Sequence, residues 1–169
     1  MYSEKIVEQV RRVPKPLTGV LRGTMVVFAV IFLALGIIIS RGFMLTGFLF
    51  VMLYYFYDAH SQKEYEYILE DNQLTIDVIL GKNRRRCAHV LDMEALEVLA
   101  PNWHDAVSGY RKEGGSIRLP KYDYTSYEEN VPFYTMIITE NRVKIKLLLE
   151  LSDRMLQIIK KKYPDRVYL

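Results

Sequence analysis

Two long apolar segments, Gly23 to Ser40 and Gly42 to Tyr57, follow one another in the N-terminal third of the chain, with Arg41 between them. The first contains no charged residue, and as an α-helix its 18 residues would reach about 27 Å, close to the thickness of a bilayer's hydrocarbon core. A buried helical hairpin of a soluble protein normally carries a polar stripe, but here Thr24 and Thr46 are the main polar interruptions. The pattern therefore predicts a two-helix transmembrane hairpin over residues 23–57.

The charged residues that flank these segments predict the orientation of the hairpin. Four basic residues lie between residue 11 and the first segment, whereas the connecting loop offers one. They are Arg11, Arg12, Lys15 and Arg22. Because cytoplasmic flanks are enriched in Lys and Arg, the N-terminal arm (residues 1–22) is expected in the cytoplasm, and two spans return residues 58–169 to the same side. We therefore expect a multi-pass protein of the cell membrane with both ends of this chain cytoplasmic.

The N-terminal arm has the spacing of a short amphipathic helix. Ile6, Val7 and Val10 would share one side of this helix, and Pro14 and Pro16 would end it. Such a helix could lie on the membrane surface, but the arm's cations also serve simply to set topology, and this second interpretation is favoured.

The two sides of the hairpin differ in charge. Residues 1–22 hold five basic and two acidic side chains, and residues 58–169 hold seventeen basic and eighteen acidic ones. The nearly neutral C-terminal part lacks the concentrated basic face that nucleic-acid binding requires, so nucleic acid is not an expected partner. The single cysteine, Cys87, cannot form a disulfide within the chain.

Beyond residue 58 the apolar residues recur with the two-residue period of β-strands, separated by short turns. About seven antiparallel strands are expected, over residues 64–70, 74–80, 84–90, 95–99, 116–119, 133–139 and 142–150. In the second and last strands the alternation places five residues inside: Ile76, Val78, Val143, Ile145 and Leu147. A C-terminal amphipathic helix is expected after Ser152, a suitable N-cap, with Met155, Leu156 and Ile159 on its apolar side.

This order of elements resembles a pleckstrin-homology-like (PH-like) domain, in which two antiparallel sheets form a partly open barrel and a final helix plugs one end. More closely, the chain is similar to a bacterial family of two-span membrane proteins with PH-like cytoplasmic domains. The matching residues are Tyr65-Glu66-Tyr67, Leu74-Thr75-Ile76-Asp77, Gly81-Lys82 with Arg84 to Arg86, Ala100-Pro101, and Tyr122-Asp123-Tyr124-Thr125-Ser126. The resemblance implies the fold and the topology, and it brings no activity, cofactor or catalytic residue.

Four cations gather at one predicted turn: Lys82, Arg84, Arg85 and Arg86. Guanidinium groups suit bidentate contacts with phosphate or carboxylate, so an anionic headgroup or an acidic protein partner is a candidate ligand. Alternation along a strand would let Arg84 and Arg86 share a surface while Arg85 faces away. The alternative, which is favoured, is a solvated edge strand whose charges pair with Glu64, Glu66 or Asp77.

The sequence gives little support for an enzyme or a metal site. His60, His89 and His104 occur without a ligand spacing, and Cys87 beside His89 is expected to serve packing. Trp103, His104 and Asp105 form an alternative pocket, although a loop Trp that covers the barrel core is the commoner arrangement. Tyr122, Tyr124, Tyr127 and Tyr134 form either a recognition surface or a packed cluster over the open end of the barrel, and packing is narrowly favoured.

These observations favour a non-catalytic, membrane-anchored PH-like binding or scaffold module, without cofactor or metal. A small membrane enzyme that uses His104 and Asp105 on a lipid-like substrate is the first alternative. The second is an accessory subunit of a membrane complex, with the hairpin packing against partner helices through Ala29, Gly36 and Gly47. Self-association is left open.

Overall fold

The computed structural model describes residues 5–14, 17–81, 84–111 and 115–169. The chain divides into two compact units. Unit 1 comprises Met1–Val13, Glu64–Ile79 and Arg85–Leu169, and unit 2 comprises Pro14–Lys63 and Leu80–Arg84.

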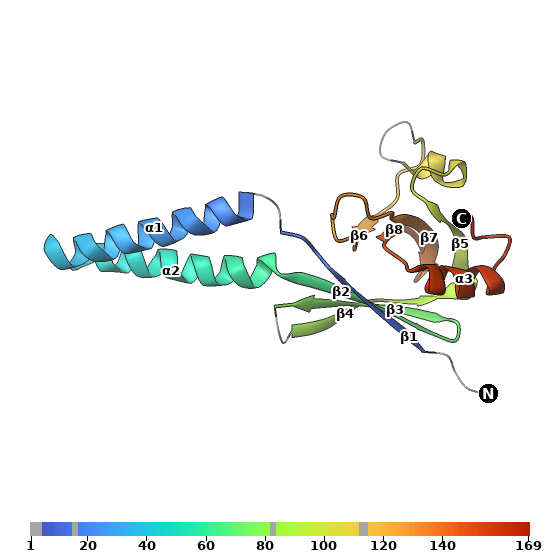
Figure 1. Ribbon diagram of the computed structural model, residues 1–169, viewed down its shortest axis with the longest axis horizontal. Helices are drawn as coiled ribbons and strands as arrows, with labels where there is room; N and C mark the ends of the chain where they lie inside the picture. Colours follow the sequence, from blue (N-terminus) through green and yellow to red (C-terminus); the bar gives the residue numbers. More distant parts are fainter. Residues whose placement is uncertain (1–4, 15–16, 82–83, 112–114) are drawn as a thin grey trace. The chain divides into compact units, whose positions relative to one another are not determined.

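The first of two four-stranded sheets has its strands side by side in chain order, β1-β2-β3-β4 (Figure 1). The strands are β1 (Ile6–Arg11), β2 (Lys63–Glu70), β3 (Gln73–Leu80) and β4 (Arg84–Asp92). The last three match the predicted strands to within a few residues, because each is joined to the next by a short turn and shows the two-residue alternation.

The expectation of an amphipathic helix in the N-terminal arm is wrong. Residues Ile6–Arg11 form β1, which pairs antiparallel with β2 from Ile6 opposite Leu69 to Arg11 opposite Glu64. Ile6 is buried in the core, whereas Val7 is exposed, as alternation along a strand requires. Residues 6–11 of the arm are therefore a strand of the β-sheet unit, and its residues from Leu17 onward belong to α1.

The second sheet has the strand order β5-β7-β8-β6. Its strands are β5 (Leu96–Pro101), β6 (Lys121–Asp123), β7 (Tyr134–Glu140) and β8 (Val143–Leu149). Short 3-10 helices, η1 (Met93–Ala95) and η2 (Asp105–Tyr110), flank β5. The strand predicted at 116–119 is not observed; β6 follows it instead and pairs parallel with β8. In the described part of the chain, eight strands thus form two mainly antiparallel sheets.

Apolar faces of both sheets and of α3 (Asp153–Lys162) share one core. Ser152 caps α3 as predicted, since its hydroxyl accepts from the Met155 N–H at 3.3 Å, and Met155, Leu156 and Ile159 are buried. Ile76, Ile145 and Leu147 are buried as predicted, and Val78 packs against the core. Val143 is 52% exposed, so its predicted inward position is wrong; it begins its strand, just after the turn at Asn141.

Unit 2 contains two antiparallel helices that lie side by side, α1 (Leu17–Ile38) and α2 (Gly42–Ser61) (Figure 1). α1 begins before the predicted segment, at Leu17. It is long and apolar enough to cross a membrane, and the apolar part of α2, Gly42–Asp58, is shorter. At one end of the pair, the Arg22 guanidinium on α1 lies 2.6 Å from the Asp58 carboxylate on α2.

Small residues bring the two helices into close contact. A Cβ at Gly36 would lie 2.3 Å from the Met44 side chain and 2.9 Å from the Met44 backbone nitrogen, and a Cβ at Gly47 would meet Leu33. Ala29 is also buried. The suggestion that Ala29, Gly36 and Gly47 pack against partner helices is therefore wrong, because the contact between α1 and α2 already uses Gly36 and Gly47 and the Ala29 side chain is not exposed.

Candidate functional site

The three arginines of the cationic turn have different environments. On β4, Arg85 pairs with Glu66 of β2, and its Nε lies 3.7 Å from the Asp77 carboxylate of β3. Both carboxylates are buried, and a buried carboxylate is costly unless a cation or hydrogen-bond donors accompany it. The predicted pairing with Glu66 and Asp77 is thus confirmed for Arg85, whose charge compensates these two groups.

Arg84 and Arg86 are exposed and form no ion pair with any other residue that the structure describes. This difference from Arg85 follows the alternation expected along a strand. Lys82, the fourth cation of the predicted site, lies outside the described residues. Of the described residues of the predicted site, Arg84 and Arg86 are therefore the ones available to bind an anion.

Asp77 also affects the neighbouring thiol. Cys87 is exposed on β4, which differs from the packing role expected for it. Desolvation by its surroundings and a hydrogen bond to the Asp77 carboxylate raise the pKa of the Cys87 thiol. Cys87 is consequently a weakly activated thiol rather than a reactive nucleophile.

The turn between β3 and β4 is fastened to the end of α2. The Gly81 N–H donates to the Gln62 carbonyl at 3.0 Å, and Gln62 is the residue that ends α2. Gly81 has φ +61°, a conformation that glycine adopts without strain. Arg84 belongs to the same unit as α2, so the beginning of β4 lies near the end of this apolar helix.

The opposite turn of the same strand is acidic. Around the turn between β2 and β3, an open hollow of about 660 Å³ is lined by Glu70, Asp71, Asn72, Gln73, Asp92 and Glu94. Because this turn precedes β3 and the cationic turn follows it, the two lie at opposite ends of that strand. Eight residues of β3 separate them, or about 26 Å.

The alternative pocket at Trp103, His104 and Asp105 does not assemble. Trp103 is 64% exposed, so it does not cover the core as expected. His104 caps η2, with its Nδ1 accepting from the Ala106 N–H at 3.1 Å, and Asp105 is exposed in the first turn of that helix. Arg111 donates to the carbonyl groups of all three loop residues 102–104. The arrangement is that of a loop held by caps and one arginine.

His89 is buried inside the domain, whereas the nearby Cys87 is exposed. Its Nδ1 is 2.7 Å from the Glu140 carboxylate of β7, and its ring packs against Tyr122 and Tyr124. Among the residues that the structure describes, no group of three or more His, Cys, Asp or Glu side chains could hold a metal ion.

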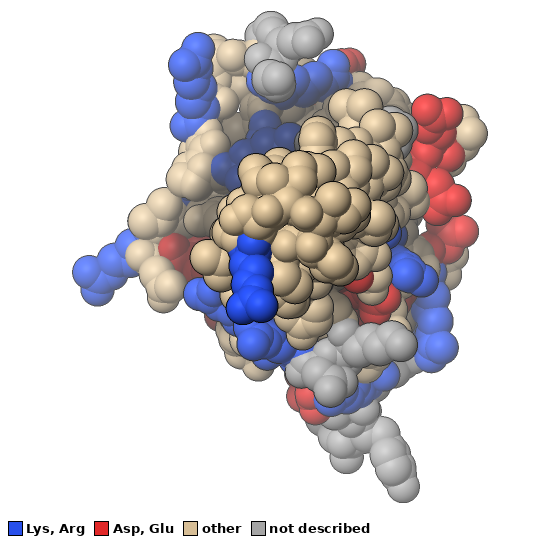
Figure 2. All heavy atoms as spheres, turned by 90° about the vertical axis from the view of Figure 1, so that its left-hand side faces the viewer, with Lys and Arg blue, Asp and Glu red and all other residues tan. Residues whose placement is uncertain are grey.

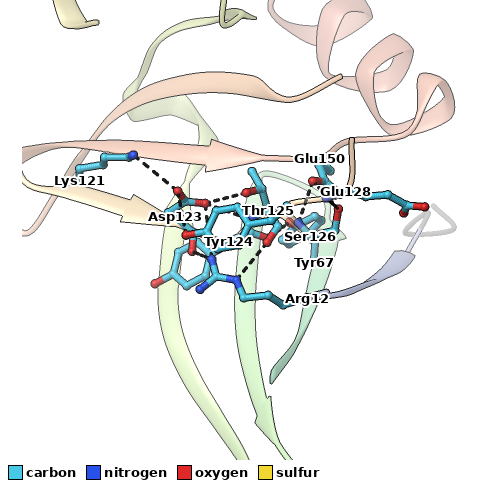
Figure 3. A network of polar contacts seen from close by, with 10 residues as sticks. Arg12, Tyr67, Lys121, Asp123, Tyr124, Thr125, Ser126, Glu128 and Glu150 are labelled. Carbon is cyan, nitrogen blue, oxygen red and sulfur yellow. Dashed lines mark hydrogen bonds and ion pairs between the residues drawn. The ribbon is translucent and has the colours of Figure 1, made fainter. Parts of the chain in front are cut away.

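An extended polar network surrounds Arg12, just after β1 (Figure 3). Its guanidinium donates to the carbonyl groups of Asp123, at 2.6 Å, and Thr125, at 3.2 Å. It also lies over the rings of Tyr65 and Tyr127, 4.9 and 4.2 Å from their centroids. Sequence reasoning treated Arg12 only as a topology signal and missed this role, because its partners are more than fifty residues away.

The segment that Arg12 binds is itself fixed from the other side. Ser126 donates its N–H and hydroxyl to Glu150, at 2.7 and 2.8 Å, and the Tyr67 hydroxyl donates to the Tyr124 carbonyl at 2.7 Å (Figure 3). Burial raises the pKa of both the Tyr67 and the Tyr124 phenol. The matched motif at residues 122–126 thus holds the end of β1 in place. Tyr124 is packed, whereas Tyr122 and Tyr127 remain exposed.

The whole chain, residues 1–169, matches a family described as a bacterial PH-like domain (DUF6106). The chain belongs to this family, and its two mainly antiparallel sheets with a C-terminal helix are the PH-like domain. Comparison with curated proteins and with solved structures gave no match.

Proposed function

We propose that this protein is a non-catalytic binding or scaffold module that α1 and α2 anchor in a membrane as two spans. The β-sheet unit is then the part that meets ligands or partner proteins on the cytoplasmic side. The exposed arginines Arg84 and Arg86 of β4 are the binding residues.

The observation that carries this proposal is the outward apolar surface of the helices. Only 11% of the most apolar window of α1 is buried, although a core helix of a soluble protein would be mostly buried. Figure 2 gives an end view of the molecule, in which the hairpin surface facing the viewer consists mainly of side chains that are neither basic nor acidic. Large side chains are exposed on both helices, including Val30, Ile37, Leu45, Phe48 and Tyr55. A bilayer would cover all of them.

The length of α2 is compatible with a second span. Gly42–Asp58 has 17 residues and reaches about 26 Å, near the lower limit for crossing a hydrocarbon core. Among the side chains that the structure describes, the only ion pair of either helix joins Arg22 and Asp58, at the end of the pair where the chain enters α1 and leaves α2. This is where polar groups would meet the membrane surface, and it leaves residues 23–57 for the bilayer.

In this proposal His104 has a structural role, because its Nδ1 accepts the Ala106 N–H and caps η2. Arg84 and Arg86 of β4 form no ion pair with any described residue, so no internal partner would compete with a ligand.

Membrane insertion is tested by extracting membranes of cells that make the full chain with alkaline carbonate. An integral protein should stay in the pellet and be released only by detergent. A variant in which Ile31, Val51 and Leu53 are changed to Glu should fail to insert, because each carboxylate would have to enter the hydrocarbon region. Release of the parent chain by carbonate would overturn the proposal.

Orientation is tested by cysteine labelling in a Cys87→Ala background. With an impermeant reagent outside the cell, Ser40→Cys in the loop between the helices should be labelled and Leu169→Cys should not, because the basic residues precede α1. The opposite pattern would reverse the topology. Labelling of both cysteines would place Ser40 and Leu169 on the same outer side and show that α2 does not cross the membrane.

A further inference from the structure

We infer that Lys146 of β8 is a site of covalent acylation, at which its amine takes the acyl group of a small acyl phosphate. The residues that make up this site all belong to the β-sheet unit, and they are separate from the arginines of β4.

Strand register places Lys146 in a row of residues that crosses the second sheet. It is directly opposite Ile137 of β7 on one side and Lys121 of β6 on the other. Its chain neighbours Ile145 and Leu147 are in the main core, so Lys146 is on the opposite face of the sheet. On that face Ile137 belongs to a second, small apolar cluster. The Lys146 side chain therefore lies between apolar residues and another cation.

The amine of Lys146 lacks a counter-ion. Its Nζ donates to the Tyr110 carbonyl at 2.5 Å, and no carboxylate that the structure describes pairs with it. The neighbouring Lys121 pairs with Asp123 at 3.5 Å (Figure 3). Desolvation by burial and the charge of Lys121 lower the pKa of the Lys146 amine. A larger fraction of this amine is therefore neutral, which is the form that attacks a carbonyl carbon.

Lys144 provides a comparison on the same strand and the same face of the sheet. Its Nζ lies 2.7 Å from the Glu97 carboxylate, and the hydrogen bond to Glu97 raises the pKa of the Lys144 amine. Lys144 is thus held in its protonated form, which has no lone pair for attack. The two lysines differ in their counter-ion and not in their strand position.

The charge beside Lys146 selects the class of acyl donor. Lys121 places a cation next to the amine, and a cation attracts an anionic reactant. In an acyl phosphate the phosphate carries the negative charge and is also the leaving group. The neutral Nζ attacks the acyl carbon, and a C–N bond forms. The C–O bond to phosphate breaks, the phosphate leaves with the bonding electrons, and the proton of the amine passes to water. The amide product is uncharged, so the repulsion between the two lysines is removed.

The test treats the full chain in detergent with acetyl phosphate at neutral pH and low salt, and mass spectrometry follows the acetylation of each lysine over time. Lys146 should react at least about fivefold faster than Lys144, because attraction of the donor by one cation is worth about that factor. In urea, where the chain is unfolded, the two rates should become equal. Equal rates in the folded chain, or a preference for Lys146 that persists in urea, would overturn the inference.

Two variants separate the contributions of the neighbouring charges. Lys121→Gln should slow the reaction of Lys146 with acetyl phosphate about fivefold, and it should slow the reaction with phenyl acetate, a neutral donor, by less. Equal slowing with both donors would overturn the assignment to acyl phosphates. Glu97→Gln is the matched control: it removes the counter-ion of Lys144, so it should accelerate the reaction at Lys144 and leave that at Lys146 unchanged. An unchanged rate at Lys144 would contradict the role given to the counter-ion.

Discussion

Arg11 of β1 and Glu64 of β2 are directly paired residues of two adjacent antiparallel strands, although the whole helical hairpin separates them in the sequence. The Arg11 Nε also lies 3.6 Å from the Glu64 carboxylate. The two apolar helices therefore occupy the position of a connection between neighbouring strands of one sheet. Both chain segments that lead to the helices are held in this sheet, so the domain has two covalent attachments to its hairpin.

Arg12 should be the most important single side chain for holding this attachment. Changing Arg12 to Ala removes two charge-assisted hydrogen bonds to carbonyl groups and the contacts with two tyrosine rings. We expect the free energy of unfolding to fall by about 2–4 kcal/mol. Urea unfolding in detergent, followed by far-ultraviolet circular dichroism, measures this free energy.

Arg11→Ala is the matched control for this prediction. Arg11 is mostly exposed and makes one long ion pair, so its loss should cost less than about 1 kcal/mol. If both substitutions lowered the free energy of unfolding equally, the network around Arg12 would contribute no more stability than an exposed ion pair does.

The inward alternation of β8 predicts very different results for two residues of similar shape. Ile145 is 4% exposed and belongs to the core, whereas Val143 is 52% exposed. Ile145→Asp should unfold the β-sheet unit, because an unpaired carboxylate in an apolar core costs several kcal/mol. Val143→Asp should leave thermal unfolding within a few degrees of the parent. Cooperative melting of the Ile145→Asp protein at the parent temperature would contradict the assigned core.

Local patterns explain which parts of the fold could be predicted. The strands from β2 to β4 are neighbours in both sequence and space, so their alternation and turns were sufficient. β1 was missed because Ile6 and Val10 also fit a helical spacing, and only its distant partner β2 decides between the two. The three residues of β6 carry no detectable period, and their strand conformation depends on parallel pairing with β8.

The candidate site, like the fold, was predictable only where it depends on local sequence pattern. Alternation separated Arg85 from Arg84 and Arg86. Of the three carboxylates expected as partners, Arg85 meets Glu66 and Asp77, whereas Glu64 lies near Arg11 of β1. The hydrogen bond from Gly81, in the turn between β3 and β4, to Gln62 could not be predicted, because main-chain groups are the same in every residue type and leave no pattern in the sequence. Whether Arg84 and Arg86 bind an anion stays a prediction.

Close packing at Gly36 should be essential for the helical hairpin. Gly36→Val places a Cβ against the Met44 backbone, which cannot rotate away as a side chain can, so α1 and α2 must separate locally. Gly23→Val is the control, because nothing lies within 4 Å of a Cβ there. Phe32 and Phe50 stack across the helices at 5.7 Å between centroids, so cysteines at these two positions in a Cys87→Ala chain report the contact. Oxidative cross-linking should fall in Gly36→Val and persist in Gly23→Val; equal yields would contradict the packing.

Alkaline pH should unfold the β-sheet unit as its buried tyrosines ionise. Burial raises the pKa of Tyr67 and Tyr124 above the ordinary value of 10.0. Above pH 10.0 the unfolded chain therefore loses these protons while the folded chain keeps them, so the unfolded state is stabilised and the free energy of unfolding falls as pH rises.

Phenolate absorbance and far-ultraviolet circular dichroism, followed in one alkaline titration, measure this linkage. Part of the phenolate signal should appear together with loss of the β-sheet signal, because burial keeps Tyr67 and Tyr124 protonated while the domain is folded. Tyr67→Phe should weaken the pH dependence, because one of the protons held only by the folded state is gone, at a cost of about 1 kcal/mol for the hydrogen bond to the Tyr124 carbonyl. Ionisation of every tyrosine in a single step while the sheet signal is intact would mean that Tyr67 and Tyr124 are not held protonated by burial.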